Sequence, residues 1–450
     1  MTDPSPAAIG AKTILRDSLG LSQGTDLLLL LDETALSVLD PFWEAARELG
    51  VNLSTLFYSR LQQLHLSEMS RLDRNALASA EAAILAHTAD DACSSFRTKL
   101  VSEWRGTTRL ATMPGANAQI LEIASRSDYE QMAKRCEALT PPLLNGRECV
   151  LTTYAPSGEA FRLRFTLGGL DRIPVHSIGI LRESAWGNVP SGEIFTAPLE
   201  DSANGDYLVN GTIGRQVLGD EPAVLTFRHG RLIGHRYLTS GEPVPYLLEI
   251  ERFSAEREDH NWNVIAEFGI GVNEGINAVL GIPLIDEKIF GTVHIAVGNN
   301  VGWQGSNKAL LHLDIITREP DVEIDGVNVL LRGRHKFDAS AFDDLATYHP
   351  VPGRLWPRDS TSARVNTKGF SLAEGRLMIH LHQTQSGRRT LFPLANARTT
   401  SAARRLLKSA RGQVLDTTRT PGDLDLHTQE EVQALLSLLW SYGAIEPATD

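Results

Sequence analysis

Residues 262–316 read WNVIAEFGIGVNEGINAVLGIPLIDEKIFGTVHIAVGNNVGWQGSNKALLHLDII, and this stretch predicts how the middle of the chain folds. It contains three apolar segments with the length and composition of β-strands: Asn263–Gly269, Gly291–Gly298 and Ala309–Ile316. Clusters of Gly and Asn separate these segments, and such residues are typical of turns. We therefore expect three successive strands in a largely buried sheet.

Each expected strand also carries side chains that a core strand rarely has: Glu267, then His294, then His312 with Asp314. Side chains alternate across a strand, so His312 and Asp314 should point to the same face. Burying an imidazole and a carboxylate among Leu and Ile is costly unless something neutralises them. A divalent metal ion does so, and His, Asp and Glu are its usual ligands. The alternative is a buried His–Asp hydrogen bond without metal.

Four phrases strengthen the metal interpretation: PSGEIFTAP, which contains Glu193, then AEFGIGVN, DEKIFGTVHIAVG and HLD. In this order they resemble the aminopeptidase T family of two-metal metallopeptidases. The resemblance covers about Thr108–Asp338, is weaker over the first hundred residues, and does not include the C-terminal tail. It implies that the metal ligands are Glu193, Glu267, His294, His312 and Asp314.

The family resemblance implies a hydrolase that removes N-terminal residues from a peptide substrate and works as a homodimer. Two divalent ions, zinc or cobalt, would activate a water molecule and polarise the peptide carbonyl. Glu267 and Glu193 are the expected catalytic carboxylates, with Glu267 bridging the ions. Lys288 is expected either to steady an anionic intermediate or to form an ion pair with Asp286 or Glu287.

One departure from the family pattern bears on the chemistry. Many members have a tyrosine at the metal site seven residues after the first histidine, where this chain has Val301. Either Asn299, Asn300 or Trp303 reshapes the pocket, or the reaction is not peptide hydrolysis.

Two other functions remain open from the sequence. His294, His312 and Asp314 also form the set of two histidines and one carboxylate that binds a single Fe(II) in non-haem oxygenases, and a ring-cleaving pyridine dioxygenase resembles this family. Retention of Glu193 and Glu267 favours two metals over this alternative. A third interpretation is a peptide-binding or peptide-tailoring protein of a ribosomal-peptide pathway, with a precursor peptide held by the C-terminal tail.

Composition limits the class of protein. The chain has 450 residues, of which 42% are hydrophobic, and its net charge is −12. An acidic chain has no basic field for nucleic acid, so we expect no such partner. The longest early apolar run, Leu27–Leu31, is too short for a membrane span, and the N-terminus does not read as a signal peptide. Three cysteines without metal-ligand spacing (Cys93, Cys136 and Cys149) fit small core residues in a reducing cytoplasm.

We predict an α/β protein with an N-terminal doubly wound parallel sheet over residues 1–145. Alternating patterns over 146–338 predict a strand-rich α+β metal-binding domain. A helix over Ser127–Leu139 should end at Pro141–Pro142. Residues 339–370 read as a proline-containing linker, and 371–450 as a small winged-helix-like module with a hairpin and a helix over Val432–Tyr442.

Overall fold

The structure is a computed structural model. It describes residues 4–58, 70–87, 101, 108–182, 186–336, 362–365, 367–373, 376–384, 387–394, 402–403, 405–407, 414–416, 421–424, 426, 429–441 and 445–447. The chain forms two compact units, and each is discontinuous in sequence. The first comprises Met1–Met132, Ser177–Glu193 and Gly271–Phe290, and the second comprises Ala133–His176, Ile194–Ile270 and Gly291–Asp450.

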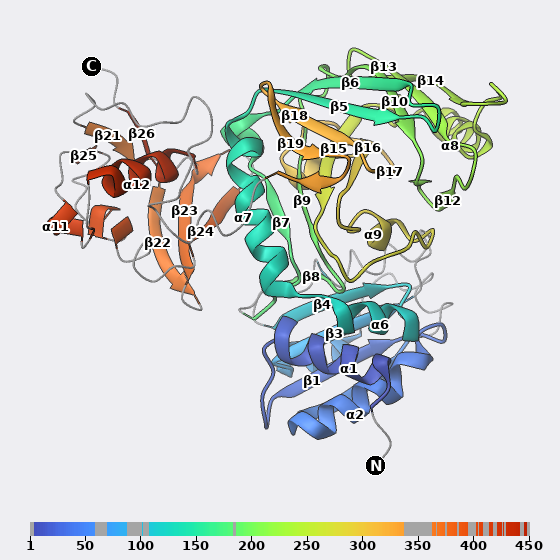
Figure 1. The fold of residues 1–450 in the computed structure, drawn as a ribbon. Coiled ribbons are helices and arrows are strands. Elements are labelled where there is room, and N and C mark those ends of the chain that lie inside the picture. The colour runs from blue at the N-terminus through green and yellow to red at the C-terminus, as the bar shows by residue number, and fades with distance from the viewer. Residues whose placement is uncertain are drawn as a thin grey trace. The chain divides into compact units, whose positions relative to one another are not determined.

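The first unit contains the expected parallel sheet (Figure 1). Its strands, in spatial order, are β2 (Asn52–Phe57), β1 (Asp26–Leu31), β3 (Ala82–His87), β4 (Arg109–Pro114) and β8 (Trp186–Asn188). All four neighbouring pairs are parallel. The fifth strand comes from a much later part of the chain than the other four, which no local pattern had indicated.

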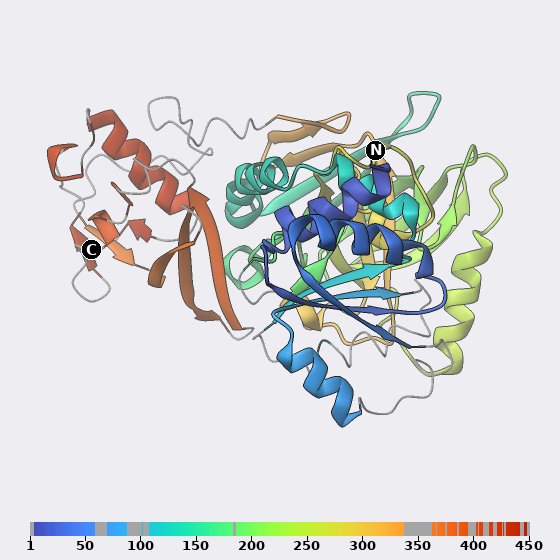
Figure 2. The ribbon, with the colours of Figure 1, turned by 90° about the horizontal axis from the view of Figure 1, so that it is seen from below.

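Both faces of this sheet are covered, and this explains the sequence DLLLLL of β1. Leu27, Leu29 and Leu31 belong to a core cluster with residues of α1 (Pro6–Thr13), α2 (Leu39–Leu49) and α6 (Ala118–Arg126). Leu28 and Leu30 pack on the other face with Leu77 of α4 (Arg71–Ser79). Figure 2 shows α1 and α2 lying over the strands. A strand that is buried on both sides reads as a continuous apolar run, as in a doubly wound fold.

Two sheets build the second unit. The strands of the eight-stranded sheet, in spatial order, are β14 (Arg231–Tyr237), β13 (Ala223–Arg228), β10 (Asn204–Val209), β6 (Ala160–Thr166), β5 (Glu148–Tyr154), β18 (Asp321–Ile324), β19 (Val327–Leu331) and β20 (Arg334–His335). Those of the seven-stranded sheet are β12 (Gln216–Val217), β11 (Thr212–Ile213), β17 (His312–Arg318), β16 (Thr292–Gly298), β15 (Ile265–Gly271), β9 (Glu193–Thr196) and β7 (Val175–Ser177).

The two sheets pack through one face of each. The rings of Phe165 on β6 and Phe268 on β15 lie 5.1 Å apart, and the Tyr207 hydroxyl on β10 donates to the Val293 carbonyl at 3.5 Å. Phe268 pairs with Ile295, so this row of side chains faces the core. Because side chains alternate, the neighbouring residue of each strand points away from the eight-stranded sheet.

Further helical segments include α8 (Pro245–Glu256), α9 (Pro283–Asp286) and the short helical segments η1 (Ile14–Ser18), η2 (Leu36–Val38), η4 (Gly169–Arg172) and η5 (Val301–Trp303).

Helix α7 (Tyr129–Asn145) runs through Pro141–Pro142, so the expected end of this helix at the two prolines was wrong. Each proline lacks the N–H for one helical hydrogen bond. Leu139, Leu143 and Leu144 are all buried, and their packing on both sides of the prolines offsets this loss.

In the tail, β22 (Thr367–Ala373), β23 (Arg376–Thr384) and β24 (Gly387–Leu394) form an antiparallel sheet, which confirms the expected hairpin. The other tail elements are β21 (Ser362–Val365), β25 (Val414–Asp416), β26 (Ile445–Pro447), α11 (Pro421–Leu424) and α12 (Gln429–Ser441). Helix α12 matches the expected one. Strands β21 and β22 begin inside the stretch expected to be a linker, whose residues 339–361 lie outside the described ones. Peptide binding by this module stays a prediction.

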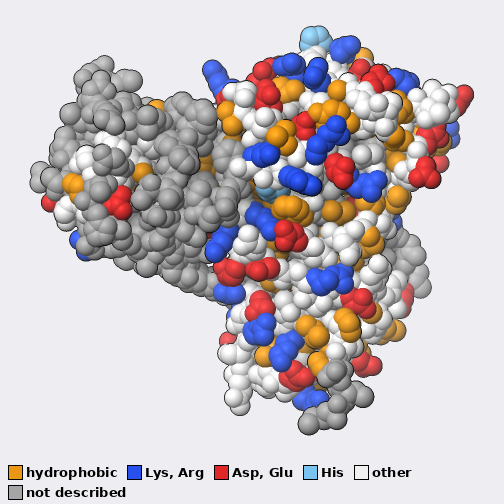
Figure 3. Space-filling model, in the orientation of Figure 1, with side chains coloured by type: hydrophobic (Ala, Val, Ile, Leu, Met, Phe, Trp, Pro, Cys, Tyr) orange, Lys and Arg blue, Asp and Glu red, His pale blue; other side chains and the backbone are white. Residues whose placement is uncertain are grey.

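The described surface carries charges of both signs, and two of the three cysteines are buried. On the face shown in Figure 3, basic and acidic side chains are interspersed over the described residues. Cys136 and Cys149 are buried, as expected, and form no disulfide with another described residue; Cys93 lies outside the described residues. Among the described residues, no helix combines the length and the apolar character needed to cross a membrane.

Candidate metal centre

The register of three strands places the predicted ligands on one face of the seven-stranded sheet. Glu267 of β15 lies opposite Ala296 of β16, and Ala296 lies opposite Asp314 of β17. His294 precedes Ala296 by two residues, and His312 precedes Asp314 by two, so they share this face. It is the face turned away from Phe268 and the core. The prediction that His312 and Asp314 lie side by side is therefore confirmed.

A glycine makes room for the first histidine. Gly269 pairs with His294 across β15 and β16. A Cβ atom at residue 269 would lie 2.2 Å from the Nε2 atom of His294 and 2.1 Å from its Cε1 atom. The imidazole therefore occupies the space that any other side chain would fill, and it is fully buried.

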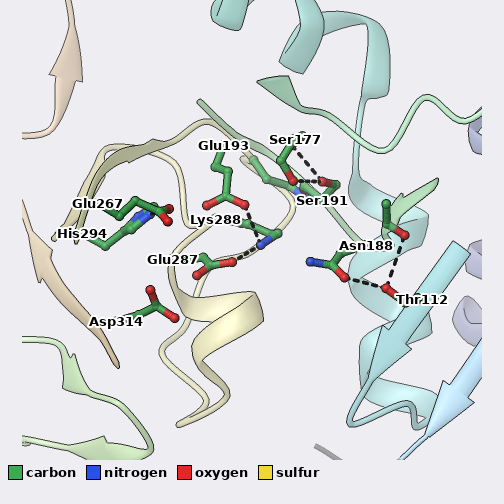
Figure 4. Close-up of polar contacts among 12 residues, drawn as sticks. Thr112, Ser177, Asn188, Ser191, Glu193, Glu267, Glu287, Lys288, His294 and Asp314 are labelled. Atoms are coloured by element: carbon green, nitrogen blue, oxygen red, sulfur yellow. Dashed lines mark hydrogen bonds and ion pairs between the residues drawn. The ribbon is translucent and has the colours of Figure 1, made fainter. Parts of the chain in front are cut away.

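Glu193, Glu267 and His294 form a compact, buried donor cluster (Figure 4). Glu193 is the first residue of β9, which neighbours β15 in the sheet. One potential ligand atom from each of the three residues lies within 4.8 Å of the other two. His294 Nε2 is 3.0 Å from Glu267 Oε1. Carboxylate oxygens and an imidazole nitrogen at this spacing form a donor set that suits zinc and similar ions.

His312 and Asp314 extend the cluster through the second oxygen of Glu267. His312 Nε2 lies 3.4 Å from Glu267 Oε2 and 3.1 Å from Asp314 Oδ1. The other ring nitrogen, Nδ1, is 2.8 Å from the Asn299 carbonyl, to which it donates. This bond turns Nε2 towards the carboxylates, just as a hydrogen bond to the other ring nitrogen orients a metal-bound histidine. The side chains of His312 and Asp314 are 22% and 13% exposed, so the centre opens on this side.

A lysine that is not among the expected ligands belongs to the cluster. The side chain of Lys288 is fully buried, its Nζ lies 3.0 Å from Glu193 Oε1, and it donates to Glu287 Oε1. Of the expected ion pairs, the structure contains the one with Glu287. Asp286 instead accepts backbone N–H groups of residues 280–282. A charged residue inside the apolar run of DEKIFGTVHI was the available signal.

The loop after β16 stands where the family tyrosine would be. Val301 is 53% exposed in η5 and contributes no ligand. Trp303, two residues on, packs its ring edge-to-face on His312 with centroids 5.1 Å apart. Asn300 Nδ2 and the Ser306 N–H both donate to Glu200 Oε1.

Glu200 in turn is held by Arg172. The guanidinium of Arg172 binds both carboxylate oxygens of Glu200, with a closest distance of 2.8 Å. Burial raises the pKa of Glu200, but bonds from Arg172, Ser306 and Asn300 outweigh it and lower the pKa to about 2. The loop of residues 300–306 is thus tied to a carboxylate that stays charged down to about pH 2.

Electrostatics at the centre follow from these contacts. Burial raises the pKa of Glu267, but hydrogen bonds from His294 and His312 outweigh it, and the net shift is downwards. Burial lowers the pKa of His312, but Asp314 and Glu267 raise it well above its usual value. The pKa of Lys288 is likewise raised, because Glu193 and Glu287 outweigh the effect of burial. The contacts thus favour the charged forms of Glu267, His312 and Lys288.

Comparisons with known proteins identify solved structures that are similar to this one. No protein-family model matches the chain, and a search of curated proteins finds no match. The structure is similar to 2,5-dihydroxypyridine dioxygenase from Pseudomonas putida KT2440, with a TM-score of 0.56 and 17% identity, over 75% of this chain and 99% of that one. It is also similar to AmpT, an aminopeptidase T, from Thermus thermophilus, with a TM-score of 0.51 and 16% identity, over 74% and 99% of the two chains.

These similarities show a shared fold. The fold is thus shared by an aminopeptidase T and a dioxygenase, and this chain carries a buried Glu–Glu–His cluster with the donor spacing of a metal site. Three of the five predicted ligands form this cluster, and His312 contacts both Glu267 and Asp314 beside it.

Proposed function

We propose that this chain is a metal-dependent hydrolase of the aminopeptidase T type, which uses two divalent ions, zinc or cobalt, to cleave N-terminal peptide bonds. One observation carries the proposal: the two oxygens of Glu267 face different histidines, with Oε1 3.0 Å from His294 Nε2 and Oε2 3.4 Å from His312 Nε2. A carboxylate in this position can serve two ligand sets at once. One set is Glu193, Glu267 and His294, and the other is Glu267, His312 and Asp314.

The donor chemistry fits both ions, because each set combines carboxylate oxygens with one imidazole nitrogen. When bound, such ions lower the pKa of a water molecule and polarise a carbonyl oxygen. The chain's own residues prepare the centre for that role. Asn299 orients His312, Gly269 leaves room for His294, and the exposure of His312 and Asp314 provides the side from which a peptide can enter.

Metal content and turnover test this proposal together. Purified protein loaded with zinc or cobalt should hold close to two ions per chain and release the N-terminal residue from small peptides or aminoacyl-p-nitroanilides. Glu267→Gln should lower both metal content and turnover, because an amide is a weaker ligand than a carboxylate. Glu242→Gln changes an exposed residue and serves as the matched control. Full loading without peptide cleavage would contradict the peptidase assignment while leaving the metal site intact.

A mononuclear iron dioxygenase is the second candidate. Val301 in place of the family tyrosine and the similarity to a dioxygenase favour it, with His294, His312 and Asp314 as the three ligands. The buried Glu193 and Glu267 argue against a dioxygenase, because a site of two histidines and one carboxylate requires neither of these residues. Anaerobic loading with Fe(II) decides between the two: one iron per chain and oxygen uptake with a dihydroxypyridine would support the dioxygenase.

A further inference from the structure

Lys288 holds a positive charge at an unusual place. Its side chain has no exposed surface, and burying an ammonium group is strongly unfavourable unless carboxylates surround it. Two do: Glu193 Oε1 is 3.0 Å from Nζ, and Glu287, itself 5% exposed, accepts a hydrogen bond from it. Figure 4 shows the ammonium group between these two carboxylates.

The charges of the cluster divide into two groups. Glu267 and Asp314 contact His294 and His312, whereas Glu193 and Glu287 contact Lys288. Glu193 is the residue common to the lysine contact and the proposed metal site. An ion bound by Glu193 would supply positive charge to the same carboxylate that Lys288 neutralises.

We propose that Lys288 is a resident counter-ion of the metal centre, which lets the chain fold without metal and weakens the binding of the ion that shares Glu193. This inference rests on the proposed metal site. Like charges close together in a buried site repel, so the ammonium group and a bound ion oppose each other. Lys288 thus lowers the affinity of the centre for the metal ion and raises the stability of the metal-free protein.

Lys288→Met tests the idea, because methionine keeps an unbranched side chain and removes the charge. Wild type and variant are stripped with a chelator and titrated with zinc chloride. The melting temperature and the zinc dissociation constant are measured. The metal-free variant should melt at least about 5 °C below wild type, because it buries unpaired carboxylates. Adding zinc should reduce this difference in melting temperature, and zinc should bind the variant at least about tenfold more tightly than it binds wild type.

Two further variants separate charge from packing. Lys288→Met combined with Glu287→Gln removes one carboxylate along with the cation, so the metal-free melting temperature should return towards that of wild type. Lys12→Met breaks an exposed ion pair, Lys12–Glu48 at 2.8 Å, and should change neither measurement appreciably.

Several outcomes would overturn the proposal. If Lys288→Met lowers the melting temperature equally with and without zinc, and the dissociation constant does not fall, Lys288 has a packing role only. If neither the single nor the double variant is soluble even when expressed with zinc, the counter-ion role is likewise rejected. A wild type that shows no zinc-induced stabilisation would contradict the metal site itself, and the role of Lys288 with it.

Discussion

Gly269 and His294 occupy the same space on the sheet: a Cβ atom at residue 269 would lie 2.2 Å from the imidazole Nε2 of His294. The two residues are paired across β15 and β16. A single hydrogen in place of a side chain thus decides whether the histidine can lie flat against the strand beside Glu267. Gly269 is therefore part of the metal centre, because it leaves the space that His294 occupies.

Gly269→Ala should therefore displace His294 and lower metal content without unfolding the chain. Residue 269 lies within a regular strand, so alanine is acceptable to the backbone, and the damage is local. We expect zinc affinity to fall by about tenfold or more, as for loss of a supporting contact, as measured by competition with a chromophoric chelator. Gly302→Ala, where the added methyl meets nothing within 4 Å, is the matched control. Equal zinc affinity in the two variants would reject this steric argument.

His312→Ala should remove one ligand and leave the fold in place. The second ligand set would retain Glu267 and Asp314 without a nitrogen donor, so that ion should bind much more weakly. Elemental analysis should show about one ion per chain instead of two, with turnover lost. His260→Ala, which replaces an exposed histidine, should retain the full metal content and normal turnover. Normal loading and turnover in His312→Ala would remove this residue from the site.

Chelation should lower the melting temperature of the wild type, and zinc should restore it. A ligand that binds only the folded state stabilises it by about 4 kcal/mol at a thousandfold excess over its dissociation constant. Magnesium should restore less, because it prefers oxygen ligands to imidazole. An unchanged melting curve after verified removal of metal would contradict the site.

Glu200→Gln should destabilise the protein in a pH-dependent way. The pKa of Glu200 is about 2 in the folded protein against 4.5 for an unperturbed glutamate, so its charge stabilises the fold fully above pH 4.5. That contribution is lost as the pH falls from 4.5 towards 2. Because solvent screens part of this interaction, the variant should be less stable than wild type by roughly 1–2 kcal/mol at pH 7, and the difference should shrink across this window. Denaturant unfolding at several pH values measures it, and a difference independent of pH would show that the charge is not responsible.

Local periodicity in the sequence predicted the fold class and the placement of His312 beside Asp314, whereas the full ligand set was implied by the family resemblance. An apolar run such as Leu27–Leu31 indicates a strand covered on two faces, and a spacing of two places His312 beside Asp314. Other features depend on contacts between distant segments. Lys288 becomes part of the centre only because β9 brings Glu193 to it. Nor could local pattern show that packing by Leu139 and Leu143 would carry α7 through two prolines.

The three-part assembly of the first unit has a consequence for how the protein is made. Its parallel sheet is completed by β8, and its core includes Ile276 and Ile285, which leave the ribosome long after the first four strands. Part of the second unit is synthesised in between. A nascent chain halted before Gly271 would therefore expose leucine and isoleucine side chains that have nothing to pack against. We expect such arrested chains to be held by chaperones, and this unit to mature late in translation.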